Sequence, residues 1–314
     1  MTNAAAGHVH DALFHQSGDD LAACAAPVLR AALAVSEAVV LSCAEASAQI
    51  LTAALGGDPR ISFVGRSGVF RRAAAAISAC QRIAEQHLAA GARRVALVGE
   101  LDFTAGQQDR TQRASFEATA SAALVSYPIW SVCIYDCRQL PREVLAAAER
   151  THPFLIAPAS RLRSPRYLDP ARFLRQARRS RPDPLEETAP VIDVTSPADL
   201  AGLRREVRAA LAGTARRPET VHGFVLAVSE VVTNALTHGR PPVRVRAWTT
   251  ASRSVCTVAD HGDGFADPLA GYLPARLADR GRGGLGLWLA RQGCDDITAE
   301  REHGSFTVRI VTRH

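Results

Sequence analysis

The 314-residue sequence contains no lysine, so all 37 of its basic residues are arginine. A phosphate-binding P-loop needs a lysine after its glycines, and this absence excludes a P-loop anywhere in the chain. No apolar run approaches the length of about 20 residues that a membrane-spanning helix requires. The N-terminal residues also lack the basic-then-apolar pattern of a secretory signal. We therefore expect a cytoplasmic protein that does not associate with membranes.

Cysteine is present at seven positions, and no two of them form a Cys-x-x-Cys pair. Most lie inside apolar segments, which favours reduced and buried thiols. Cys133 and Cys137 straddle the predicted end of one strand, which leaves a redox-sensing role open. Their spacing matches no thiol-exchange motif, so packing in the core is the favoured interpretation.

The length of the chain predicts about two domains, and 47% apolar residues are enough for packed cores. Residues 158–187 are rich in proline and hold eight arginines against four acidic residues. We interpret this segment as a linker between residues 1–157 and 188–314, with at most one short basic helix at about 171–179. Its charge leaves nucleic-acid binding open, but a solvated linker explains the same composition.

Short apolar runs alternate with helical patterns in residues 1–157. This alternation predicts a mostly parallel sheet covered on both faces, which is a three-layer α/β domain. The predicted strands are residues 38–43, 61–65, 95–99 and 131–135, with a weaker fifth near 12–14. The predicted helices are residues 20–34, 45–55, 67–90, 112–126 and 141–150.

The opening segment of this domain is His8-Val-His-Asp-Ala-Leu-Phe-His15, followed by an Asp-Asp helix start and an Ala-Val-Val-Leu-Ser strand. It resembles the MEDS (methanogen/methylotroph sensory) domain, which implies a RecA-like sensory domain that lacks a nucleotide site. A strand would place His8 and His10 on one face, and with His15 they are candidate metal ligands. No carboxylate or cysteine spacing completes a ligand set, so a metal site is not expected.

Residues 221–238 form one predicted amphipathic helix. Glu230, Asn234 and His238 recur every fourth residue and therefore line up on one face. A carboxylate, a carboxamide and an imidazole beside small residues fit a ligand site better than a solvated face. The opposite face is apolar and consists of Val221, Phe224, Val225, Val228, Val232 and Ala235.

Three short segments follow this helix. Asp260-His-Gly-Asp-Gly264 places a carboxylate at the end of a strand, and its glycines let backbone approach a ligand closely. Gly281-Arg-Gly-Gly-Leu-Gly-Leu287 opens a second helix, and backbone N–H groups at a helix start bind phosphate. Gly304-Ser-Phe-Thr307 begins a closing strand.

Together these four segments resemble the motifs of the GHKL ATPases, the superfamily of gyrase, MutL and histidine kinases. The pattern Ser-Glu-x-x-x-Asn-Ala, with no lysine before the histidine, is most similar to bacterial anti-sigma factor serine/threonine kinases. The resemblance covers about residues 190–314. It implies a two-layer α+β domain that binds ATP with Mg²⁺.

The resemblance also implies a role for individual residues. Glu230 is the expected general base, and Asn234 is the expected Mg²⁺ ligand. Asp260 is expected to accept the adenine amino hydrogen, with Thr307 supporting it. The other implied ATP-binding residues are His238, Gly262, Gly264, Gly284, Leu285 and Gly286. An expected lid over the nucleotide offers three candidate phosphate contacts, which are Arg276, Arg280 and Arg282.

The remaining elements of residues 188–314 complete one sheet with helices on one side. The predicted strands are residues 191–196, 243–250, 254–259, 295–301 and 305–312. A helix is predicted at 197–213, with Ser196 as its N-cap and a proline at its first position.

Three functions share this ATP site. The favoured one is a signal-responsive anti-sigma regulator that phosphorylates Ser or Thr on an antagonist, with a sigma factor or a STAS-type anti-sigma antagonist as partner. A non-catalytic, ATP-gated protein-binding module stays open. A sensor histidine kinase is disfavoured, because the helix predicted at 197–213 contains no phosphoacceptor histidine. Direct nucleic-acid binding is not expected, and a homodimer is left open.

Overall fold

The computed structural model describes residues 7–35, 37–66, 73–103, 107–158, 160–177, 182–212, 217–265, 267–272 and 285–314. The chain divides into two compact units, a first unit of Met1–Leu174 and a second unit of Arg175–His314. Each unit has its own sheet and its own apolar core. No helix among the described residues combines the length and the apolar character needed to cross a membrane.

The first unit is built on a seven-stranded sheet in the order β3-β2-β4-β5-β1-β6-β7. Every neighbouring pair is parallel except β6 and β7, which are antiparallel. Its strands are β1 (Val9–His15), β2 (Ala38–Ser42), β3 (Ile61–Phe63), β4 (Val95–Gly99), β5 (Ile129–Asp136), β6 (Phe154–Ala157) and β7 (Ser160–Arg163). The weakly predicted first strand therefore lies inside the sheet, between β5 and β6.

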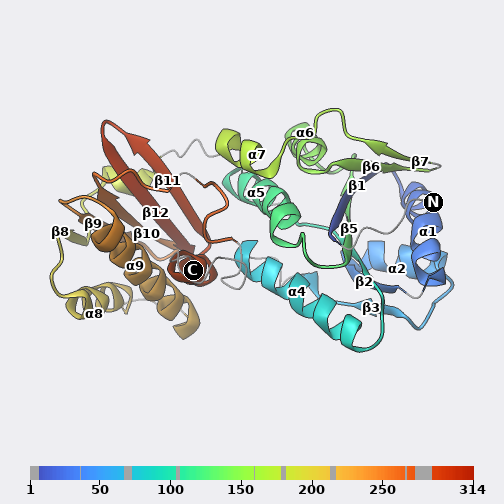
Figure 1. Ribbon diagram of the computed structural model, residues 1–314, viewed down its shortest axis with the longest axis horizontal. Helices are drawn as coiled ribbons and strands as arrows, with labels where there is room; N and C mark the ends of the chain where they lie inside the picture. The colour runs from blue at the N-terminus through green and yellow to red at the C-terminus, as the bar shows by residue number, and fades with distance from the viewer. Residues whose placement is uncertain are drawn as a thin grey trace. The chain divides into compact units, whose positions relative to one another are not determined.

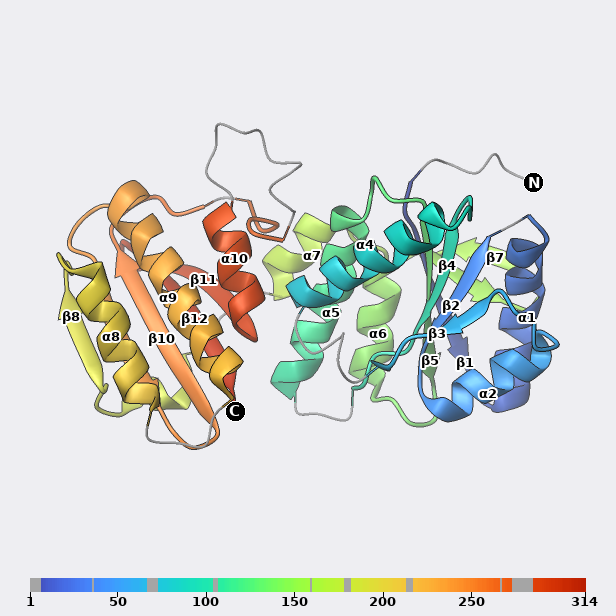
Figure 2. The same cartoon turned by 90° about the horizontal axis from the view of Figure 1, so that it is seen from below.

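Helices cover both faces of this sheet, which confirms the predicted three-layer α/β architecture. Figure 2 shows α1 and α2 on one face and α4, α5 and α6 on the other. The core under α1 and α2 includes Leu21, Leu29 and Leu51 against Val39 and Leu41. The bounds of these helices are α1 (Gly18–Ala34), α2 (Glu45–Ala54), α4 (Ala73–Ala89), α5 (Gln107–Ala123) and α6 (Arg142–Thr151).

The segment predicted as a linker, residues 158–187, is largely structured, and this corrects the predicted domain boundaries. Its first part adds β7 to the sheet and begins helix α7 (Pro170–Ala177), whose Phe173 and Leu174 are buried. Arg161 of β7 donates from Nε and Nη2 to the fully buried carboxylate of Asp11, at 2.6 and 2.8 Å. The composition predicts solvated arginines here, whereas Arg161 pairs with a carboxylate about 150 residues earlier in the chain.

The second unit has a five-stranded antiparallel sheet in the order β11-β12-β10-β9-β8. Helices α8, α9 and α10 lie on one face of it, as Figures 1 and 2 show for the labelled elements. The bounds are β8 (Ile192–Thr195), α8 (Leu200–Leu211), α9 (Pro218–His238), β9 (Arg244–Thr249), β10 (Arg253–Asp260), α10 (Leu285–Gly293), β11 (Asp296–Glu302) and β12 (Ser305–Arg313). The predicted two-layer α+β domain is confirmed.

The other face of this sheet is covered in part by the end of the supposed linker. The short 3-10 helix η1 (Pro184–Glu187) places Leu185 against a small cluster of Trp248, Val255 and Val311. The indole N–H of Trp248 donates to the carbonyl of Thr188 at 2.9 Å. Residues 183–188 therefore belong to the fold of the second unit.

The predicted cap of helix α8 is wrong. The helix begins at Leu200 with Asp199 as its N-cap residue, three positions later than expected. Ser196 instead directly follows strand β8 in a left-handed conformation (φ 51°), and its N–H donates to the carbonyl of Val243 at 2.6 Å. The strand continues its pairing to this point, so the serine is not in position to cap the helix.

All seven cysteines are free thiols, as expected. Burial raises the pKa of Cys80 and of Cys256 to about 12. Thiols with so high a pKa are protonated and unreactive at neutral pH. Cys137 is half-buried at the end of β5, and its Sγ lies 4.0 Å from the carbonyl oxygen of Tyr135.

Candidate nucleotide site

Helix α9 carries the polar row that the sequence predicts. Its opposite face is buried in the core of the second unit, through Phe224, Val228 and Val232. Glu230 and Asn234 are half-buried, whereas His238 in the last turn is exposed. Burial of the apolar face therefore holds the carboxylate and the carboxamide on the side of the helix away from the sheet.

Helix α10 begins directly against this row. A Cβ atom built on Gly286 would lie 2.6 Å from Oε2 of Glu230 and 3.7 Å from Oδ1 of Asn234. Only glycine fits there without displacing the carboxylate, so the first turn of α10 approaches both side chains through its backbone. Leu285, next to it, is 51% exposed. The structure thus brings together two segments that lie about 50 residues apart.

The two helices can approach because glycine faces glycine further along them. A Cβ on Gly223 of α9 would lie 2.3 Å from the carbonyl oxygen of Gly293 of α10, far inside van der Waals contact. The converse holds for a Cβ on Gly293. This glycine pair sets the separation of the helices and hence the position of Gly286 beside Glu230.

Asp260 is the last residue of β10, and its side chain is buried. Its Oδ1 accepts two backbone N–H groups, from Gly262 at 2.5 Å and from Arg240 at 3.2 Å. Among the residues that the structure describes, none donates to Oδ2. The carboxylate is thus oriented by one oxygen and keeps the other available to a donor such as an amino group.

The glycines after Asp260 fit into tight surroundings. A Cβ on Gly262 would lie 2.7 Å from Oδ1 of Asp260 and 2.8 Å from the Cα of Gly239, the residue that ends α9. Gly264 has φ +67°, a conformation that side chains rarely adopt, and it lies against the ring of Phe306. These glycines therefore bring the turn after β10 next to the end of α9.

The expected support of Asp260 by Thr307 needs correction. In the register of β10 and β12, Asp260 pairs with Phe306, which faces the helices, and Thr307 pairs with Ala259. Alternation along a strand therefore places Thr307 on the opposite face of the sheet. The hydroxyl that contacts Asp260 belongs to Ser305, whose Oγ donates to the Asp260 carbonyl at 3.2 Å. Ser305 lies in the same predicted segment as Thr307, two residues before it.

Two arginines that sequence reasoning missed flank the turn after β10. Nη2 of Arg240 lies 3.1 Å from a carboxylate oxygen of Asp263, and Nη2 of Arg301 lies 3.4 Å from the other. Arg301 also donates to the carbonyl of Gly262. The position of Arg240 directly after the predicted helix was the signal that could have identified it.

Part of the predicted site lies outside the described residues. Gly284 belongs to this part, as do the three arginines of the expected lid, which are Arg276, Arg280 and Arg282. Their expected contacts with phosphate stay predictions.

The described residues offer groups for each part of a bound nucleotide, from the adenine at one end to the phosphates at the other. Asp260 provides a buried acceptor at one end, and the start of α10 provides backbone N–H groups at the other. Asn234 presents a neutral oxygen close to that helix start, which suits a hard cation such as Mg²⁺ held mainly through phosphates. Glu230 is one turn of α9 away from Asn234 and can accept a proton.

Comparison with protein families yields one match for each unit. Residues 9–153 match the MEthanogen/methylotroph, DcmR Sensory (MEDS) domain. Residues 194–312 match the histidine kinase-like ATPase domain. No curated protein matches the chain.

Proposed function

We propose that this chain, in which a MEDS domain precedes a histidine kinase-like ATPase domain, is a signal-responsive anti-sigma regulator that binds MgATP and phosphorylates a protein hydroxyl. The observation that carries the nucleotide part is the geometry of Asp260. Its Oδ1 is occupied by two backbone N–H groups, and its Oδ2 receives no hydrogen bond from the described residues. Such a carboxylate matches the 6-amino group of adenine.

Transfer of phosphate would use the row on α9. The hydroxyl oxygen of a partner Ser or Thr attacks the γ-phosphorus, the bond between that phosphorus and the β–γ bridging oxygen breaks, and ADP leaves. Glu230 takes the proton of the attacking hydroxyl. Asn234 is the residue that fits Mg²⁺, which neutralises phosphate charge when bound.

A partner protein supplies the acceptor hydroxyl in this proposal, and we expect it to be a STAS-type anti-sigma antagonist. The sensor histidine kinase is disfavoured by the packing of α8. That helix buries Leu203, Val207 and Leu211 in the core of the second unit, and it contains no histidine. A helix used in this way is part of the ATPase domain and is not a separate phosphoacceptor helix.

One observation favours the second candidate, an ATP-gated binding module without catalysis. Oε2 of Glu230 lies beside Gly286 at the N-terminus of α10. A carboxylate at a helix N-terminus stabilises that helix electrostatically by about 0.3–1 kcal/mol. In a module, this would be the whole role of Glu230, and the nucleotide would act only by ordering the surface that the partner binds.

Glu230→Gln separates the two functions. The amide keeps the size and polarity of the side chain but cannot accept the proton, so a kinase should keep nucleotide binding and lose transfer by about 10²–10⁴-fold. Transfer is measured with radiolabelled ATP and candidate STAS-type antagonists, and partner binding is measured on the same samples. Glu219→Gln, an exposed substitution in the first turn of the same helix, is the matched control and should leave transfer unchanged.

Two outcomes would contradict the kinase. Absence of transfer by the wild-type protein, with equal partner binding by both proteins in ATP, would identify the binding module. Transfer that is unaffected by Glu230→Gln would show that another group activates the hydroxyl.

A further inference from the structure

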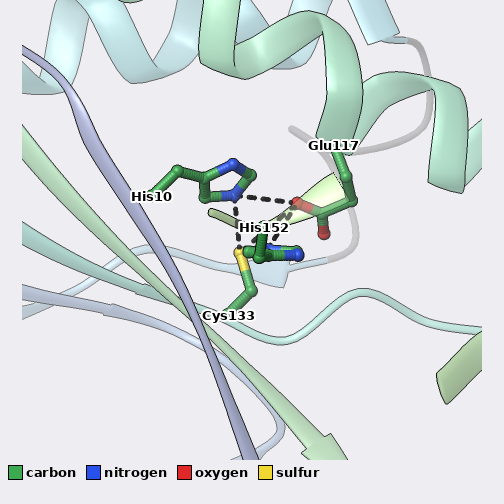
Figure 3. Close-up of side chains that lie close together, drawn as sticks. All are labelled: His10, Glu117, Cys133 and His152. Carbon is green, nitrogen blue, oxygen red and sulfur yellow. Dashed lines mark hydrogen bonds and ion pairs between the residues drawn. The ribbon is translucent and has the colours of Figure 1, made fainter. Parts of the chain in front are cut away.

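Four side chains converge inside the first unit. All four precede the segments of the nucleotide site in the sequence. They are His10, Glu117, Cys133 and His152, and Figure 3 shows their ring nitrogens, carboxylate and sulfur pointing toward one another. One ligand atom from each lies within 4.8 Å of all the others. His10, Glu117 and His152 are at most 3% exposed, and Cys133 is 9% exposed.

The fold assembles this cluster from four separate elements. His10 comes from β1 and Cys133 from the adjacent β5, where Cys133 pairs with Ala12, so both project from the same face of the sheet. Glu117 comes from α5, and His152 directly follows α6. Both helices cover that face (Figure 2). The His10 that appeared to lack partners in sequence therefore has three in space.

Each oxygen or nitrogen ligand is oriented by a second partner through its other polar atom. Nδ1 of His152 lies 2.9 Å from the Ala148 carbonyl, which can only accept, so Nδ1 carries the proton. Nδ1 of His10 bonds to Oγ of Ser121 at 2.8 Å. The hydroxyl of Tyr135 donates to Oε1 of Glu117 at 3.2 Å. These contacts direct both Nε2 atoms and Oε2 into the cluster, as outer partners do around protein metal ions.

Four of the six distances between the ligand atoms are 3.0–3.4 Å, close to those around a tetrahedral ion. Zinc bonds of about 2.0–2.3 Å to nitrogen, oxygen and sulfur require ligand atoms about 3.3–3.7 Å apart in a tetrahedron. Oε2 of Glu117 lies 3.0 Å from Nε2 of His10, and it lies 3.4 Å from both Nε2 of His152 and Sγ of Cys133. Sγ of Cys133 lies 3.3 Å from Nε2 of His10.

A simple ion pair between Glu117 and a histidine accounts for less of this arrangement. Nε2 of His152 is buried, and it has no hydrogen-bond partner among the described residues. Its distance of 3.4 Å from Glu117 is long for a charge-assisted hydrogen bond, which is about 2.7–2.9 Å. Without a metal, the sulfur takes part only as a weak S–H donor to Oε2 of Glu117, at 3.4 Å. A divalent cation would use all four atoms, and with one thiolate and one carboxylate the buried site would be neutral.

We propose that the first unit binds a zinc-class divalent transition-metal ion through Nε2 of His10, Oε2 of Glu117, Sγ of Cys133 and Nε2 of His152. Two imidazoles, one thiolate and one carboxylate are a ligand set that Zn²⁺ accepts. All four positions come from protein side chains, so the ion links β1, β5, α5 and the end of α6. The thiol proton of Cys133 passes to solvent when the ion binds.

The first test is cobalt substitution in the full-length chain. The protein is treated with a chelator, dialysed and titrated with Co²⁺. The proposal predicts one equivalent bound, with a sulfur-to-cobalt charge-transfer band and the intense visible bands of tetrahedral Co²⁺. Cys133→Ala should remove the charge-transfer band, and His152→Gln should weaken the visible bands. Cys24→Ala is the matched control, because Cys24 is buried on the other face of the sheet, and it should leave the spectrum unchanged.

A second measurement does not depend on whether the variants fold. X-ray absorption at the zinc edge of the wild-type, zinc-loaded protein should show one sulfur at about 2.3 Å and three nitrogen or oxygen atoms at about 2.0–2.2 Å.

Tyr135→Phe, which removes only the outer contact to Glu117, should weaken zinc binding by about 10–100-fold. Binding of less than one equivalent of Co²⁺ and Zn²⁺ after chelation, or a zinc shell without sulfur, would overturn the proposal.

Discussion

The two units build their polar centres in opposite ways. In the second unit, Glu230 and Asn234 are one helical turn apart, and Asp260 and Gly262 are two residues apart, so each motif is local in sequence. In the first unit, more than 100 residues separate His10 from the other members of its cluster. A site whose residues lie close together in the sequence can be recognised from short sequence motifs. A parallel sheet brings distant residues together only once its strand order is known.

That strand order accounts for the difference. In the first unit β1 lies between β5 and β6, so its side chains meet residues from the last third of the unit. In the second unit β10 pairs with β9 directly before it, and β12 pairs with both β10 and β11. Long-range pairing in one unit and mostly short-range pairing in the other predict different responses to substitution.

The largest effect is expected for Arg161→Ala in the first unit. The substitution leaves the buried carboxylate of Asp11 without its cation. Of the side chains that the structure describes, the indole N–H of Trp130 alone still donates to it, at 3.0 Å. We expect a loss of about 3 kcal/mol in the free energy of unfolding, the lower end for a broken buried pair because the guanidinium is 39% exposed. Urea denaturation followed by fluorescence measures it.

Arg163→Ala in the same strand is the control for this experiment. Arg163 is exposed, so its loss should change stability by no more than about 0.5 kcal/mol. Equal effects of the two substitutions would mean that residues 160–163 act as a solvated linker after all.

A smaller effect is expected in the second unit, where two hydroxyls of one strand are compared. Ser305→Ala removes the hydrogen bond to the Asp260 carbonyl and should lower the free energy of unfolding by about 0.5–1.5 kcal/mol. Thr307→Ser keeps a hydroxyl on the opposite face and should cost less. Denaturation of both variants under one set of conditions measures the two losses in the free energy of unfolding. A larger loss for Thr307→Ser would restore Thr307 as the supporting residue.

Strong local patterns allowed most of the fold to be predicted from sequence. The continuous apolar run at Val95–Gly99 is a strand with the predicted bounds, because a strand buried on both faces needs no alternation. The sequence predicts strand β1 only weakly, because it carries two histidines and an aspartate. His10 and Asp11 are tolerated at the centre of the sheet because they have partners there, and partners are not visible in a local pattern.

The errors share this cause. β7 is rich in arginine and exposed along its length, so its composition resembles a linker, and only its pairing with β6 makes it a strand. A serine before a proline predicts a helix cap at Ser196, but this residue directly follows β8 and its N–H bonds to the carbonyl of Val243. The face of the sheet on which Thr307 lies depends on the register of β12 with β10, which a local pattern does not give. In each case the outcome depended on a neighbouring strand.

The central claim is that Asp260 recognises adenine, and calorimetric titration of Asp260→Asn with ATP tests it most directly. Two backbone N–H groups hold Oδ1, so an asparagine would keep its oxygen there and turn its NH₂ toward the adenine amino group. Two facing donors should weaken ATP binding by about 1–3 kcal/mol, roughly 5–150-fold, whereas Asp263→Asn in the same turn, which is exposed, should bind like the wild type. ATP affinity that is unchanged in Asp260→Asn would contradict the account.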